Sequence, residues 1–208
     1  MGSTDPAAFW DGVYADRPAA ADPRPNVRLV EHVTGLPPGD VLDLGCGEGG
    51  DALWLARQRW RVTAVDVSEV AVRRLAGLAG AHGLDRLITA ERHDLAVTFP
   101  SGAYDLVSAQ FFQTPLALDR AGVLRTAAYA IRPGGVLLVV DHGSAAPWSW
   151  NRDPGVHYPT PGEVADGLAL DPAEWTVERS EVLRRIATGP GGETAEVADH
   201  VLAVRRAV

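Results

Sequence analysis

Residues 41–50 read VLDLGCGEGG, and this stretch decides the fold. A short apolar run typical of a buried strand leads into a loop with glycines at positions 45, 47, 49 and 50, and the amphipathic segment DALWLARQ follows. Glycines let a backbone turn sharply and approach a ligand closely, and a helix start offers free N–H groups to an anionic ligand group. The stretch therefore predicts a strand, a ligand-binding loop and a helix in succession.

The chain around this loop alternates short apolar runs with longer amphipathic stretches between residues 41 and 141. Such alternation is typical of βαβ units that build a parallel sheet. The expected strands are 41–44, 61–66, 87–92, 104–109 and 136–141. The expected helices are 50–58, 69–82 with Ser68 as N-cap, and 116–131. We therefore expect an α/β fold with a doubly wound, mostly parallel sheet.

The two ends of the chain follow a different pattern. A short helix at 161–168 precedes two extended runs, 175–185 and 193–206, and Gly189-Pro190-Gly191-Gly192 supplies turn residues between them. This predicts a C-terminal antiparallel hairpin that brings the sheet to seven strands. The Pro- and Ala-rich N-terminus, which contains Phe9, Trp10 and Tyr14, is expected to form a short helix and an irregular arm.

Composition narrows the function classes. The 208 residues are 46% hydrophobic and carry a formal net charge of -8, which predicts one domain with an acidic surface and argues against nucleic acid as a partner. All 19 basic residues are arginines, so Schiff-base chemistry and a Walker lysine are excluded. The single cysteine forms no internal disulfide, and the lack of a long apolar run or leader predicts a cytoplasmic protein with no membrane partner.

Two ligand classes fit the glycine loop. Gly45, Gly47 and Gly50 satisfy the dinucleotide-binding pattern. Three features favour S-adenosylmethionine over a nicotinamide: Asp43 stands two residues before the first glycine, Gly49 completes an acidic-x-Gly-x-Gly-x-Gly pattern, and the terminal hairpin is foreign to the dinucleotide topology. With these features the chain resembles the class I S-adenosylmethionine-dependent methyltransferases over roughly residues 36–208.

Further motifs downstream extend the resemblance. Asp66 in VTAVDVS stands where the family's acidic residue holds both ribose hydroxyls, a task that suits a carboxylate. Asp94 in RHDL matches the position that binds the adenine amino group, with Leu95 beside the ring. YDLVSAQFF and IRPGGVLLVV match the family's fourth strand and the helix-turn-strand that follows it. The resemblance implies a Rossmann-like fold and S-adenosyl-L-methionine as the cofactor.

The cofactor contacts come from the loop, the strand ends and the arm. By resemblance, the backbone of Gly45 and Gly47 contacts the methionine portion, and a carbonyl near Ala109 or Gln110 receives its amino group. Trp10 and Tyr14 lie four apart on one helical face and, with Asn26, are expected to fold over the cofactor. The full predicted set is Asp43, Gly45, Cys46, Gly47, Gly49, Asp66, Val67, Asp94, Leu95, Ala109, Gln110, Trp10 and Tyr14.

Some of these residues also have a plain structural interpretation. Asp43 either contacts the cofactor or braces its own loop, and Asp66 and Asp94 also suit turns or caps. Cys46 is interpreted as a small residue in a tight loop and not as a nucleophile.

The substrate side is expected beyond the fourth and fifth strands, where the crevice of an open α/β sheet lies. The predicted substrate-side residues are Phe111, Phe112, Trp148, Trp150 and Tyr158. The alternative is that the aromatic residues of the later loop pack onto the sheet.

No catalytic residue is identified from the sequence. His142 and His157 are candidate general bases for a hydroxyl or amine acceptor, or else packing or surface histidines. No histidine pair has zinc-ligand spacing, and Asp141-His142 lacks an acidic companion, so no metal is predicted.

The predicted single domain has four parts. They are an N-terminal arm or lid (1–36), a cofactor-binding core (37–141), a substrate-side loop and helix (142–170) and the C-terminal hairpin (171–208). The arm sequence FWDGVY and the hairpin resemble the small tellurite-resistance and thiopurine methyltransferase-like group. That group implies methyl transfer to a small-molecule acceptor by in-line displacement, catalysed mainly by alignment. A non-catalytic cofactor-binding protein and a nicotinamide-dependent oxidoreductase are the alternatives, and the oligomeric state is left open.

Overall fold

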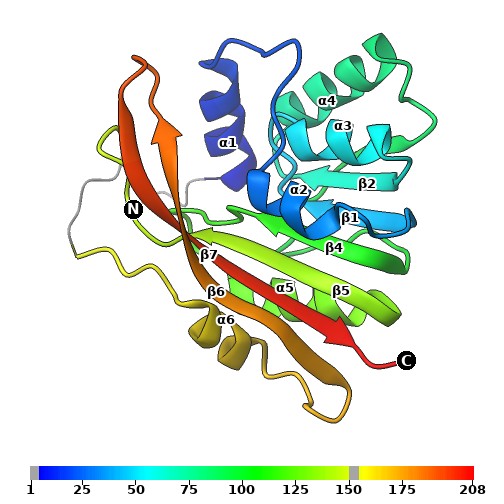
Figure 1. Ribbon diagram of the computed structural model, residues 1–208. Coiled ribbons are helices and arrows are strands. Elements are labelled where there is room, and N and C mark those ends of the chain that lie inside the picture. Colours follow the sequence, from blue (N-terminus) through cyan, green and yellow to red (C-terminus); the bar gives the residue numbers. More distant parts are fainter. Residues whose placement is uncertain (1–4, 150–154) are drawn as a thin grey trace.

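The computed structural model describes residues 5–149 and 155–208. Its strands form one seven-stranded sheet in the order β3-β2-β1-β4-β5-β7-β6 (Figure 1). The strands are β1 (Asp40–Leu44), β2 (Arg61–Asp66), β3 (Ile88–Arg92), β4 (Tyr104–Gln110), β5 (Ile131–His142), β6 (Trp175–Thr188) and β7 (Thr194–Arg206). The helices are α1 (Pro6–Ala15), α2 (Val27–Val33), α3 (Gly50–Arg57), α4 (Glu69–Ala81), α5 (Arg120–Tyr129) and α6 (Pro161–Leu168).

The predicted fold class is confirmed. Strands β1 to β5 pair in parallel, and β7 pairs antiparallel with both β5 and β6. The strand order reverses between β1 and β4, so the connections that leave these two strands diverge and open a crevice at their carboxyl ends. The predicted turn at 189–192 joins the two strands of the terminal hairpin.

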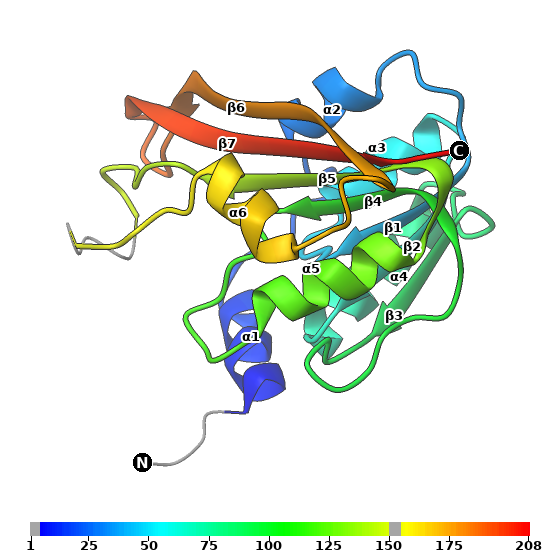
Figure 2. The same ribbon diagram turned by 90° about the horizontal axis from the view of Figure 1, so that it is seen from below.

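Alternating strand residues supply two buried cores, one on each face of the sheet. Val41, Leu106 and Leu138 pack against α2, α3 and α4. Leu42, Val107 and Leu137 point to the opposite face and pack against α5 and α6. Figure 2 shows α5 and α6 on one side of the sheet and α2 on the other. Within the described ranges, none of the helices combines the length and apolar character that crossing a bilayer requires.

Strand β5 begins at Ile131, five residues before the expected start, and two helical elements also differ from the expectation. The helix expected at 116–131 begins only at Arg120, because the Asp119 side chain accepts a hydrogen bond from Gly122 N and caps the helix there. The preceding residues are therefore a loop, which lines the functional site described below. The arm also contains a second helix, α2, whose start is capped by the Asn26 side chain.

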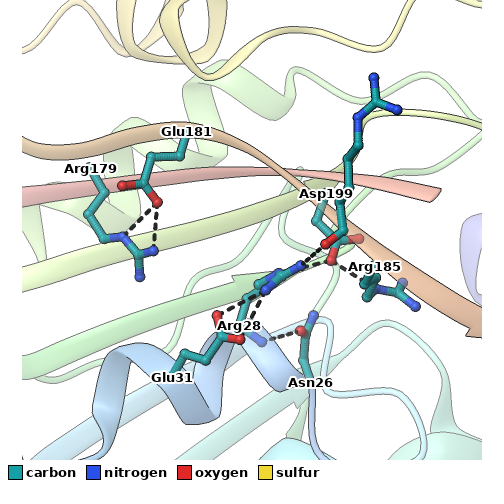
Figure 3. Close-up of polar contacts among 8 residues, drawn as sticks. Asn26, Arg28, Glu31, Arg179, Glu181, Arg185 and Asp199 are labelled. Carbon is teal, nitrogen blue, oxygen red and sulfur yellow. Dashed lines mark hydrogen bonds and ion pairs between the residues drawn. The ribbon is translucent and has the colours of Figure 1, made fainter. Parts of the chain in front are cut away.

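Helix α2 is fixed to the C-terminal hairpin by a buried ion network (Figure 3). Nε of Arg28 and Nε of Arg185 both donate to Oδ2 of Asp199, at 3.1 and 2.8 Å. Arg28 also donates to the backbone carbonyl of Arg184 and pairs with Glu31. The side chains of Arg28 and Asp199 are 9% and 0% exposed, so this contact joins the arm to the hairpin inside the protein.

Replacing Asp199 by Ala tests this network. The variant leaves two arginines without their shared carboxylate, and we expect a loss of about 3–5 kcal/mol in the free energy of unfolding. Urea denaturation followed by circular dichroism measures it. Arg184→Ala is the matched control, because it removes an ion pair with Glu196 whose side chains are 74% and 54% exposed, and it should cost less than about 1 kcal/mol. Equal effects of the two variants would contradict the assignment.

Candidate active site

A cavity lies at the carboxyl ends of β1 to β4, at the reversal in strand order. It contains about 750 Å³ of unfilled space, part of it open to solvent. Nine residues predicted from the sequence line it: Trp10, Tyr14, Gly45, Asp66, Val67, Asp94, Leu95, Phe111 and Phe112. The structure thus brings together residues from the arm, the glycine loop and three strand ends.

The glycine loop reaches this cavity through Gly45, and two aromatic side chains lie close to its glycines. Gly45 and Gly47 have φ angles of 68° and 51°, a region that favours glycine. A Cβ atom on Gly45 would lie 2.9 Å from Cδ2 of Phe112, and one on Gly47 would lie 2.9 Å from the Tyr14 hydroxyl oxygen. Both positions therefore require glycine for conformation and for space.

The other two glycines are approached from behind the loop. A Cβ atom on Gly49, whose φ is 84°, would lie 2.6 Å from Cδ1 of Leu75. A Cβ atom on Gly50 would lie 2.3 Å from the carbonyl oxygen of Arg24. The fourth glycine is thus required by the arm, which crosses the start of α3, and not by the cavity.

Asp66 closes β2 and faces the cavity. Its two carboxylate oxygens accept hydrogen bonds from Gly47 N at 3.0 Å and Ser68 N at 2.9 Å. Burial raises the pKa of this carboxyl, and these backbone donors oppose the rise. The carboxylate therefore ties the glycine loop to the start of α4.

Two further carboxyl groups lie behind the loop, one of them buried. Asp43 is 2% exposed, and within the described ranges its Oδ2 atom has no hydrogen-bond partner. Burial raises its pKa well above the ordinary value, helped by the charges of Asp51 and Asp66. Asp51 accepts a 2.6 Å hydrogen bond from Asn26 N, and burial raises its pKa to about 6. Within the described ranges, this unpaired oxygen gives no support to the loop-bracing role considered for Asp43. A positive charge nearby would favour the ionised forms of Asp43, Asp51 and Asp66.

The loop's cysteine has little nucleophilic character. Burial and the neighbouring carboxylates raise the pKa of the Cys46 thiol well above its ordinary value, which keeps it protonated.

Helix α1 covers one side of the cavity and stands beside α4 (Figure 1). The rings of Trp10 and Tyr14 lie 6.0 Å apart, as their spacing predicted. Oδ1 of Asp11 accepts from the Ser68 hydroxyl at 2.6 Å and from Val70 N at 3.1 Å, which fastens α1 to the start of α4. These hydrogen bonds lower the pKa of Asp11, whereas burial raises the pKa of Tyr14 and keeps it a neutral phenol.

Asn26 does not reach over the cavity as expected. Its side chain accepts from Arg28 N and caps α2, which leaves it outside the cavity lining.

The loop after β4 forms the opposite wall. Phe111 has a φ of 52°, its N–H donates to Val140 O at 2.7 Å, and its ring stacks on His142 at 4.1 Å. Nε of Arg120 donates to the carbonyl of Phe112 at 2.6 Å. Arg120 also binds both carboxylate oxygens of the buried Asp141, at 2.6 and 2.7 Å.

Asp141 therefore anchors this loop, and both of its carboxylate oxygens are already bound by Arg120. Within residues 5–149 and 155–208, no group of three or more His, Cys, Asp or Glu side chains is placed to hold a metal ion.

Several predicted residues do not line the cavity. Ala109 and Gln110 are buried at the end of β4, beneath it. Trp148 lies close to Gly189 in the turn between β6 and β7. His157 is exposed and bonds to Glu163, because both flank the capped start of α6. The others that do not line it are Asp43, Cys46, Gly47, Gly49, His142 and Tyr158, and Trp150 lies outside the described residues.

Sequence patterns missed other parts of the site. The cavity is also lined by Gln113, Thr114, Leu116 and Leu118. The apolar spacing of Leu116 and Leu118 assigned that part of the stretch to the next helix. Asp11, Asp51 and Arg120 act through hydrogen bonds to distant segments, and no local pattern signals such a partner.

Comparisons with known proteins agree with this architecture. A family model described as "Methyltransferase domain" matches residues 41–135. The 2-heptyl-1-hydroxyquinolin-4(1H)-one methyltransferase of Mycobacteroides abscessus is 29% identical over 81% of this chain and 72% of its own length. Nocamycin O-methyltransferase of Saccharothrix syringae is 30% identical over 93% of this chain and 66% of its own length. Several other curated relatives are longer, and the chain spans less than half of each.

Solved structures extend the likeness over the whole chain. A structure described as "Conversion of a Disulfide Bond into a Thioacetal Group during Echinomycin Biosynthesis" superposes with a TM-score of 0.72 at 27% identity, covering 98% of this chain and 92% of that one. The glycopeptide N-methyltransferase MtfA, complexed with S-adenosyl-L-homocysteine, has a TM-score of 0.62 at 18% identity over 92% and 90% of the chains.

The predicted subgroup is not confirmed by these comparisons. TehB from Haemophilus influenzae has a TM-score of 0.63 at 18% identity, over 86% of this chain and 62% of that one, which shows a common fold alone. The class itself is supported by the family model, the relatives and the strand order together. The chain belongs to the class I S-adenosylmethionine-dependent methyltransferases, and S-adenosylmethionine is its cofactor.

Proposed function

We propose that this protein transfers the methyl group of S-adenosylmethionine to a small-molecule acceptor bound in the cavity beneath α1. The observation that carries the proposal is that Asp66, Asp94 and Gly45 line the same cavity as Trp10 and the loop after β4. One cavity thus holds both the expected cofactor contacts and room for an acceptor. The relatives named above act on small molecules, which supports this choice of acceptor.

The cofactor supplies an activated methyl group, and the chain's own residues bind and align the reactants. Asp66 would hold the ribose, Asp94 and Leu95 the adenine, and Gly45 the methionine portion. Asp43 and Asp51 lie behind the glycine loop, and their carboxylates would favour the positive charge of a bound sulfonium. Catalysis in this arrangement depends mainly on holding acceptor and methyl group in line inside a partly closed cavity.

Of the two candidate bases, His142 is the one in contact with a lining residue, because its ring stacks on Phe111. The residue is exposed, and partial desolvation of its ring lowers its pKa, which favours the neutral imidazole. An acceptor that is already a soft nucleophile needs no such base. A cytoplasmic location remains a prediction from the sequence.

Replacing Asp66 by Ala tests the cofactor site. We expect the affinity for S-adenosylhomocysteine, measured by isothermal titration calorimetry, to fall by about tenfold or more, because charge-assisted hydrogen bonds are lost. Asp105→Ala is the control, since Asp105 binds Asp40 N and Arg132 away from the cavity. Unchanged affinity in Asp66→Ala would contradict the ribose contact, and tighter binding of reduced nicotinamide would favour the oxidoreductase instead.

The buried carboxylates predict a pH dependence of cofactor binding. The pKa of Asp51 is raised to about 6, so this group ionises as the pH rises through that value. A cationic ligand stabilises the ionised forms, so the affinity for S-adenosylmethionine should rise about threefold or more between about pH 5.5 and about pH 7.5.

Calorimetric titrations at the two pH values measure this effect. S-adenosylhomocysteine, which lacks the sulfonium charge, should respond less, and Asp51→Asn should flatten the dependence. An identical pH response of both ligands would refute the electrostatic role.

The lid role of α1 depends on the Asp11 contact with Ser68 and Val70. Asp11→Ala should release α1 and accelerate dissociation of S-adenosylhomocysteine by about tenfold, because two hydrogen bonds to a carboxylate are lost. Stopped-flow tryptophan fluorescence measures the rate, with Asp16→Ala at the other end of α1 as the control. Deleting residues 1–25 should have at least as large an effect. Unaltered kinetics in both variants would show that α1 is no lid.

A further inference from the structure

No arginine is among the described residues that line the acceptor half of the cavity. Beyond the glycine loop the lining is apolar and aromatic: Pro6, Trp10, Phe111, Phe112, Leu116 and Leu118. Gln113 and Thr114 supply its neutral polar groups. The carboxylates Asp66 and Asp94 lie at the cofactor end, and His93 beside them is held between Glu91 and Thr98.

Two arginines near the cavity already have hydrogen-bond partners. Arg120 binds Asp141 and the carbonyl of Phe112, and Arg92 donates to the carbonyl of Val67. Because no arginine is among the described residues that line the cavity, an anionic acceptor would lose its hydration there without gaining a counter-ion from the lining. A cationic acceptor would compete with the sulfonium for the same carboxylates and be repelled by it. The charge distribution selects a neutral acceptor.

The shape of the lining adds a second requirement. Trp10 on α1 and the pair Phe111 and Phe112 on the loop after β4 line the same cavity from two different elements. The loop wall is fixed, because Phe111 stacks on His142 and the carbonyl of Phe112 is held by Arg120. Fixed aromatic rings bind best to another flat ring, through stacking or edge contacts.

We propose that the acceptor is an uncharged aromatic molecule that binds between Trp10 and the Phe111–Phe112 wall, with Gln113 and Thr114 available to its polar substituent. This assignment of the acceptor class rests on the proposed function. It excludes phosphorylated, carboxylated and amine acceptors for this cavity.

Binding of matched probes tests the assignment without requiring turnover. The protein is saturated with S-adenosylhomocysteine and titrated by calorimetry with 1-naphthol, 1-naphthoate, 1-naphthylmethylammonium and decahydro-1-naphthol. These probes share a ring skeleton and differ in charge or flatness. We expect 1-naphthol to bind about tenfold more tightly than each of the other three.

A charge-insertion variant sharpens the test. Leu118→Arg places a cation in the acceptor half and should raise the affinity for 1-naphthoate by about tenfold, because a partly buried ion pair forms. Ile186→Arg is the control, because Ile186 is an exposed residue of β6 outside the cavity lining. It should leave the order of the probes unchanged.

Three outcomes would overturn the acceptor class: no binding of 1-naphthol, binding of either ion as tight as that of 1-naphthol, or equal binding of decahydro-1-naphthol. The preceding titration with S-adenosylhomocysteine distinguishes failure of the proposed function from failure of the acceptor class. Failure of that cofactor titration counts against the proposed function, whereas a bound cofactor with the wrong probe order counts against the acceptor class alone.

Discussion

The fold and the site both depend on how closely the chain approaches its own glycine loop. Four segments meet there: the Phe112 ring, the Tyr14 hydroxyl, the Leu75 side chain and the carbonyl of Arg24. Each takes the space of a missing side chain. Since the first two are also cavity walls, the spacing that packs the core sets the shape of the binding site. A larger residue in this loop would displace a wall, an anchor or the arm.

The fold and the first contacts of the cofactor site could be predicted because their signals are local. An apolar strand followed by spaced glycines, and an aspartate that closes the next strand, are readable from about ten residues each. Asp66 is where that pattern placed it, at the cavity edge. The second helix of the arm was missed because its seven residues are too short for a helical period to stand out.

The contacts that position the site could not be predicted in this way. Asp11 and Ser68 are 57 residues apart, and Arg120 and Asp141 are 21 apart. A single polar residue carries no periodicity, so its partner becomes known only when the topology brings the two together. The start of α5 was placed too early for a related reason. Leu116 and Leu118 extend the apolar spacing of the helix toward the N-terminus, whereas the Asp119 cap makes the helix itself begin at Arg120.

Arginine has a consistent structural use in this lysine-free chain. Arg28, Arg120 and Arg125 each donate to a backbone carbonyl of a segment far along the chain or in a neighbouring loop. Arg125 binds the carbonyls of Gly167 and Leu168, where the end of α6 leaves acceptors unpaired. A planar group with five N–H donors can bind a carboxylate and a carbonyl together, which an ammonium group does with less directional control.

The place of β7 in the sheet makes completion of the sheet wait for the last of its strands to be synthesised. β7 is the last strand made, yet it lies between β5 and β6, so β5 has an open edge and β6 has no partner until residues 194–206 are available. Arg28 likewise waits for Asp199, 171 residues later. A nascent chain therefore carries an exposed strand edge and an undocked arm until residues 194–206 have left the ribosome, and this interval is when it most needs protection by chaperones.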